Sequence, residues 1–168
     1  NVGVAPGEFR YFESHRLSAV LQNVGQGIIT PGSMINPYCC FVDPSEASFP
    51  YNGTPPSLAI NSVGGVFRDL NYVGGTFSPD FDKGATDYYG FAVDYTGIDP
   101  VVYLVVKDAG GNMTMSDGIT VPGLAGGPAM PMLYGHIVSD TVPSVTLNLG
   151  LQKFHYDLPA VKAALQGL

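Results

Sequence analysis

The sequence predicts an all-β chain: a single β-sandwich or jelly-roll-like domain with an extended N-terminal arm and a short C-terminal helix. Short runs of β-branched and aromatic residues recur along the chain, with turn residues between them. Gly and Pro number 22 and 14 of the 168 residues, about a fifth, against roughly 12% in average proteins. Strand and helix patterns do not alternate, which argues against a nucleotide-binding α/β fold.

The chain is expected to open with an arm at residues 1–9, followed by one β domain at residues 10–168. The first eight residues are small, include glycine and proline, and show no periodicity. Segments of this kind are often ordered by a partner. A strand-like pattern starts at Arg10. The uncharged residues 17–42 that follow are interrupted by glycines and prolines, so no transmembrane helix is expected there.

A short apolar run at residues 38–42 predicts another strand, and the Pro-, Ser- and Asn-rich residues 44–56 predict a long surface loop. The only cysteines, Cys39 and Cys40, are adjacent in that run. Because a disulfide between adjacent residues is strained, they imply no disulfide framework. Their apolar flanks predict buried, inert thiols.

The clearest strand patterns follow. The motif N-x-V-G-G-x-F occurs at residues 61–67 and again at 71–77, which indicates two short strands with bulges, turns or close backbone approach. Residues 89–95 alternate large apolar residues with small or polar ones, the period of a strand. The β-branched and aromatic residues 101–106 predict a central, buried strand.

The last third of the chain completes the predicted domain. Residues 108–112 contain Asp, Gly and Asn, which tolerate positive φ, so a turn is expected there. Further strands are expected at residues 113–115, 132–138 and 145–149, which gives about nine to eleven strands in all. Residues 158–168 predict the helix, because Asp157 can cap it, Pro159 suits its first turn, and its apolar residues share one face.

No pattern in the sequence predicts an enzyme or a cofactor. The three histidines, His15, His136 and His155, do not have a metal-binding spacing. No serine lies in a nucleophile elbow, and no glycine-rich phosphate loop occurs. The expectation is therefore a protein without catalytic activity.

One acidic loop is a weak candidate for calcium. Asp80, Asp82 and Asp87 surround Gly84, and hard cations bind several oxygens on a tight loop. The spacing departs from that of an EF-hand, because the glycine is one position early and no glutamate follows. Lys83 adds an opposing charge. A solvated turn is the alternative interpretation.

The scarcity of charge is the most informative feature for function. Charged residues make up 12% of the chain, against about 25% in typical proteins. The net charge is −7 and no basic run exists, which argues against nucleic-acid binding. A chain of 17.7 kDa exposes roughly 8,000 Å², which is a large area for so few charges. Much of this surface is therefore expected to be covered by neighbouring proteins.

Three functions agree with this expectation. The first is a virion structural protein, a capsid, cement or decoration subunit of a phage or similar virus, packed against copies of itself and other structural proteins. The second is an extracellular or cell-surface filament subunit, pilus-like, assembled by strand addition. The third is a carbohydrate- or receptor-binding β module of a fibre, in which tyrosines and phenylalanines stack on sugars.

The predicted interface residues are apolar and fall into three groups. They lie in or beside the arm, in the uncharged segment, and in a flexible methionine-containing group. They are Val2, Val4, Phe9, Tyr11 and Phe12; Ile28, Ile29, Met34 and Ile35; and Met130, Met132 and Leu133. Each position could instead belong to the core.

Overall fold

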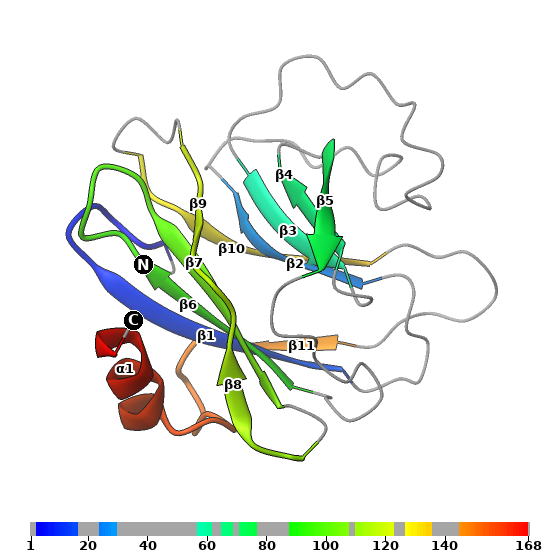
Figure 1. Ribbon diagram of the computed structural model, residues 1–168, viewed down its shortest axis with the longest axis vertical. Coiled ribbons are helices and arrows are strands. Elements are labelled where there is room, and N and C mark those ends of the chain that lie inside the picture. The colour runs from blue at the N-terminus through cyan, green and yellow to red at the C-terminus, as the bar shows by residue number, and fades with distance from the viewer. Residues whose placement is uncertain are drawn as a thin grey trace, which may run out of the picture.

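In the residues that it describes, the computed structural model has two antiparallel β-sheets and one C-terminal helix (Figure 1), which confirms the all-β class. It describes residues 3–16, 24–29, 57–61, 65–68, 71–76, 88–107, 110–122, 127–135 and 145–167. Within these residues no helix is long and apolar enough to cross a membrane.

The larger sheet has six strands. Five of them form the order β11–β1–β6–β7–β8, and β9 also pairs with β7. Their bounds are β1 (Phe9–Arg16), β6 (Tyr88–Asp94), β7 (Val101–Lys107), β8 (Met113–Met115), β9 (Ile119–Thr120) and β11 (Val145–Asn148). The β-branched strand β7 is thus central, as its sequence predicts.

The second sheet has five strands in the order β10–β2–β3–β4–β5. Their bounds are β2 (Val24–Ile29), β3 (Ser57–Asn61), β4 (Gly65–Arg68), β5 (Asn71–Thr76) and β10 (Met130–Gly135). The chain passes between the sheets in the connections β1–β2, β5–β6, β9–β10 and β10–β11. Strands that are far apart in sequence therefore become neighbours, such as β1 and β11.

The six-stranded sheet has a core face built from the alternate residues of its strands. Phe12 of β1 stacks on Phe91 of β6, with ring centroids 5.2 Å apart. The large residues of 89–95 lie on this face, as their alternation predicts. Its strand residues are 2% exposed or less: Phe12, Tyr89, Phe91, Val93, Val102, Leu104 and Val106.

The opposite face is covered by the helix α1 (Leu158–Gln166), and we call it the helix-covered face (Figure 1). Asp157 caps α1 as predicted, because its carboxylate accepts the N–H of Ala160 at 3.2 Å, and a proline lies in the first turn. Val161 is fully buried against the sheet. The Lys162 ammonium lies 5.5 Å from the centre of the Phe9 ring, a cation–π contact.

The first described residues link the two sheets. Val4 is fully buried and exchanges two backbone hydrogen bonds of 2.8 Å with Ala129, which immediately precedes β10. The Gly7 N–H then donates to the Tyr95 carbonyl at 2.7 Å, after β6 of the other sheet. The sequence does not predict this placement for a segment of small residues.

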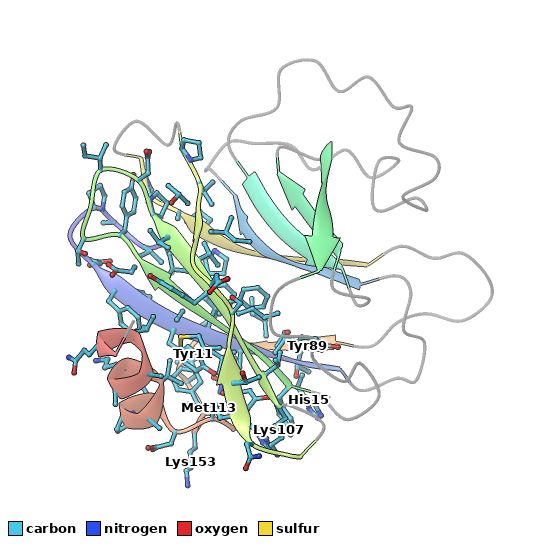
Figure 2. The ribbon with its side chains drawn as sticks, in the orientation of Figure 1. Tyr11, His15, Tyr89, Lys107, Met113 and Lys153 are labelled. Atoms are coloured by element: carbon cyan, nitrogen blue, oxygen red, sulfur yellow. The ribbon has the colours of Figure 1, made fainter. Side chains whose placement is uncertain are left out.

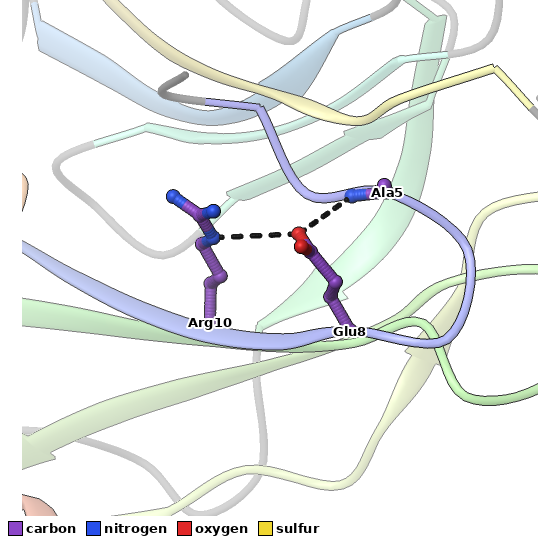
Figure 3. Close-up of polar contacts among 3 residues, drawn as sticks. All are labelled: Ala5, Glu8 and Arg10. Carbon is purple, nitrogen blue, oxygen red and sulfur yellow. Dashed lines mark hydrogen bonds and ion pairs between the residues drawn. The ribbon is translucent and has the colours of Figure 1, made fainter.

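The turn that leads from this segment into β1 is closed by a side chain (Figure 3). The Glu8 carboxylate accepts the Ala5 N–H at 3.1 Å and lies 3.5 Å from the Arg10 guanidinium Nε. Both charged side chains are about 40% exposed, so the ion pair itself adds little stability. The Glu8 N–H also donates to the Ala5 carbonyl at 3.0 Å, so two hydrogen bonds between these residues fix the backbone of the turn.

The other predicted elements fall into two groups. The turn after β7 is confirmed, with Gly111 at φ 81°, and the predicted late strands correspond to β8, β10 and β11. The two copies of the N-x-V-G-G-x-F motif correspond to the strands β4 and β5, which pair with a register shift between Gly65 and Phe67. The strand at 38–42, the loop at 44–56 and both cysteines lie outside the described residues.

Candidate functional site

Polar and aromatic residues gather at one end of the helix-covered face. The alternation of β1 places Tyr11, Glu13 and His15 on this face, and the strand register sets His15 opposite Tyr88 of β6. The segment before α1 adds His155 and Tyr156. We call these six residues the Glu13 cluster: Tyr11, Glu13, His15, Tyr88, His155 and Tyr156.

The carboxylate of Glu13 is the centre of this cluster. Glu13 is only 3% exposed, and it accepts three hydrogen bonds. The donors are the Tyr11 hydroxyl at 2.8 Å, the His155 N–H at 2.6 Å and the Tyr156 N–H at 2.8 Å. A buried carboxylate needs such partners, because burial removes its hydration. These bonds fix the segment before α1 onto β1.

A glycine makes room for this arrangement. Gly90 lies opposite Glu13 in the ladder between β1 and β6. A Cβ at this position would collide with the Tyr11 ring and hydroxyl, so only glycine leaves space for Tyr11 to reach Glu13. The edge of the Phe154 ring packs against Tyr11, with ring centroids 4.8 Å apart.

Three aromatic rings form a stack beside the carboxylate. The Tyr88 ring lies 4.1 Å from that of His15 and 4.0 Å from that of His155, and all three rings are within 3° of parallel. Two imidazoles so close and parallel to one ring occupy its opposite faces. The Tyr156 hydroxyl donates to the Tyr88 carbonyl at 3.0 Å. His155 and Tyr156 thus hold Tyr88 through both its ring and its backbone.

The electrostatics of the cluster favour the neutral forms of Tyr11 and His155. Burial and then the Glu13 charge raise the pKa of Tyr11 well above its ordinary value, so Tyr11 remains a donor. Partial burial and then the Lys107 ammonium lower the pKa of His155, while Glu13 opposes this shift. Figure 2 shows His15 and Lys107 at the same end of the sheet.

The contacts of the cluster join separate parts of the chain. The Glu13 oxygens are occupied by donors, and the histidines stack on a tyrosine instead of facing a nucleophile. In the described part of the chain, no three His, Cys, Asp or Glu side chains are grouped to hold a metal ion. The described geometry therefore supports a structural joint between the N-terminal strand and the C-terminal segment.

Two aliphatic side chains project fully from the described surface. Ile98, in the turn between β6 and β7, is 91% exposed, and Leu151, after β11, is 95% exposed. Leu149 is 38% exposed. Such side chains make almost no contact within the chain, which makes them candidates for contact with another protein.

The residues predicted beside the arm are placed inside this chain. Val4, Tyr11 and Phe12 are 7% exposed or less, and Phe9 is partly buried below Lys162. Their role in an interface stays a prediction.

The strand register brings two other predicted groups together. Met130 lies opposite Ile29, and Pro131 opposite Ile28, on the neighbouring strands β10 and β2. Met132 and Leu133 continue along β10. The remaining predicted residues lie outside the described part of the chain: Val2, Met34, Ile35, Asp80, Asp82 and Asp87.

Sequence reasoning missed the Glu13 cluster and the exposed aliphatic pair. Glu13 and His155 are 142 residues apart, so no local spacing connects them. One signal was present, because Glu13 continues the alternation of Phe9 and Tyr11 on one face of a strand. For Ile98 the signal was an aliphatic residue between Gly97 and Asp99 in a turn.

Comparison with known proteins finds no match to this chain among protein-family models, curated proteins or solved structures.

Proposed function

We propose that this chain is a structural subunit of a larger protein assembly, with a virion shell as the favoured setting, where it would serve as a capsid, cement or decoration protein. The observation that carries the proposal is the low density of surface charge. The chain exposes 8,549 Å² and has 14 acidic and 7 basic side chains, about 400 Å² for each charge. In a chain of average composition, the exposed area per charged side chain would be roughly half as large.

The exposed aliphatic side chains support the same conclusion. Ile98 and Leu151 are almost completely solvated in the isolated chain, and burying one such side chain is worth about 1.5–3 kcal/mol. They lie on different parts of the six-stranded sheet, one in the β6–β7 turn and one beyond the edge strand β11. A subunit with neighbours on several sides would bury both.

The finer architecture is also a proposal. We expect the two sheets to pack face to face as a sandwich or jelly roll, as in many subunits of this kind. The support is that Val4 and Ala129, at the edge of the five-stranded sheet, belong to the same buried cluster as Phe91 and Leu104 of the other sheet.

The decisive measurement is the assembly state of the purified chain. Light scattering over a range of concentrations, with electron microscopy of the same samples, should show ordered oligomers. The variants Leu151→Glu and Ile98→Glu should remain folded, because neither side chain contacts the core. Each should raise the concentration needed for assembly about tenfold or more, since an apolar contact is lost.

A matched control separates the apolar contact from the added charge. Gln152→Glu adds the same charge beside Leu151, at an exposed residue that is already polar, and should change assembly much less. A wild-type chain that stays a clean monomer at millimolar concentration would overturn the proposal.

An extracellular filament assembled by strand addition is a second candidate, and the pairing of Val4 with Ala129 favours it. In such a filament the first residues would make this pairing with a neighbouring copy. Removal of residues 1–8 should then abolish filaments, and a synthetic peptide of those residues should cap the truncated monomer. Assembly that survives the truncation would exclude this candidate.

A further inference from the structure

The C-terminal strap, which we define as residues 149–167, covers the sheet without adding a strand to it. The ladders between β1, β6 and β7 are complete beneath it. Its apolar contacts come mainly from Tyr156, Val161 and partly buried neighbours on α1. The strap could therefore leave the helix-covered face without breaking a hydrogen bond between these three strands.

Asn148 of β11 binds the backbone at the start of the strap, at Gly150, Gln152 and Lys153, and the polar attachment of the later residues to β1 and β6 is at the Glu13 cluster. The carboxylate of Glu13 holds two consecutive backbone N–H groups of the strap, and the His155 ring stacks on Tyr88. His15 stacks on the other face of the same ring. Two of the three histidines of the chain thus meet at the point of attachment.

We propose that the strap opens from the sheet when His155, stacked on Tyr88 beside the Glu13 anchor, takes up a proton, so that mildly acidic solution uncovers the apolar face beneath it. This inference does not rest on the proposed function.

The charged and titratable groups around His155 come from every element that packs there. They are Glu13 and His15 on β1, Tyr88 on β6, Lys107 on β7 and Tyr156 on the strap. A proton on His155 would place a second positive charge near the Lys107 ammonium, which disfavours the charged ring. Glu13 is one negative charge, and it already has three hydrogen-bond donors.

The direction of the pH effect follows from linkage. In the closed strap, partial burial and Lys107 lower the pKa of His155 below its ordinary value. His155 is already largely exposed, and in the open strap both influences are removed, so its imidazole regains a pKa of about 6.5. The closed form therefore holds fewer protons. Its stability is complete above pH ~6.5 and decreases as the pH falls below that value, until the lowered pKa is passed.

Hydrogen exchange of the full chain, followed by mass spectrometry at pH 7.5 and pH 5.5, tests this pH-dependent opening of the strap. Both values lie above the range where carboxyl groups ordinarily titrate. After correction for intrinsic rates, protection of residues 154–167 should fall at the lower pH, by at most about tenfold, since one proton contributes at most tenfold per pH unit. Protection of β6 and β7 should not change.

Two variants make the result specific to the histidines. The double variant His15→Phe/His155→Phe keeps rings on both faces of Tyr88 and keeps the backbone bonds to Glu13, yet it cannot take up protons. It should show equal protection at both pH values. Lys107→Met removes the cation beside His155 and should weaken the pH dependence. Equal protection of the wild-type strap at both pH values, or an unchanged pH dependence in the double variant, would overturn the inference.

Discussion

At the scale of single residues, Glu13 shows how one buried carboxylate can join two ends of a chain. Glu13→Gln keeps the shape of the side chain but turns one acceptor into an NH₂ donor that faces other donors. We expect the free energy of unfolding to fall by about 1–3 kcal/mol, which chemical denaturation would measure.

The chain provides a matched control for this variant. Glu8→Gln makes the same change at a carboxylate that is about 40% exposed, and it should cost less than about 1 kcal/mol. Equal losses of unfolding free energy for the two variants would show that the buried hydrogen bonds of Glu13 stabilise the fold no more than the exposed Glu8 carboxylate does.

Gly90 carries a prediction of a different kind, because its importance lies in the side chain that it lacks. Gly90→Ala should displace the Tyr11 hydroxyl from Glu13 and destabilise the fold by about 1–3 kcal/mol. Gly97→Ala is the control, since its Cβ would lie no closer than 3.8 Å to a neighbouring atom. Thermal unfolding of both variants would check this difference. An unchanged Gly90→Ala protein would mean that Tyr11 can move at no cost.

At the scale of elements, the N-cap of α1 determines how well the strap holds together. Asp157→Ala removes the carboxylate that accepts the Ala160 N–H and should cost the helix about 1 kcal/mol. Protection of the α1 amides from hydrogen exchange should then fall about fivefold. Gln166→Ala, at the exposed end of the same helix, should have little effect. The prediction fails if both variants lose protection equally.

The elements that could be predicted from the sequence are those with a local signal. Residues 89–95 alternate because one face of β6 is core, and β7 is rich in β-branched residues because both of its faces are covered. Asp157 and Pro159 mark the start of α1 by their own chemistry. In each case the residues that form the pattern are neighbours in the chain.

The candidate site could not be predicted, because its parts meet only through the sheet topology. Placing His15 and His155 on one tyrosine requires β1 beside β6 and the C-terminal segment folded back over both. The alternation of β1 predicts that Glu13 shares a face with Tyr11, but it does not show what covers that face. Val4 is a similar case, since a short segment of small residues gives no sign of its partner.

At the scale of the whole molecule, the chain has few charged residues and a closely packed core. The core face is almost completely buried, while Ile98 and Leu151 remain in solvent. The buried apolar residues thus form the core, and we expect the exposed ones to contact other proteins. A substitution in the core should change folding, whereas one at an exposed aliphatic residue should change association only.

A substitution of Val4 tests how strongly the two sheets are coupled, because the segment that contains Val4 contacts both of them. Val4→Ala removes two buried methyl groups from the shared cluster, and we expect a loss of about 2 kcal/mol in the free energy of unfolding. The two sheets should still unfold in one transition, since the segment that contains Val4 contacts both of them. Ile98→Ala is the matched aliphatic control, with an expected change within about 0.5 kcal/mol. Denaturant unfolding followed by circular dichroism and tyrosine fluorescence would measure both variants. Two separate transitions in the wild type, or equal losses for the two variants, would show that the Val4 segment does not couple the sheets.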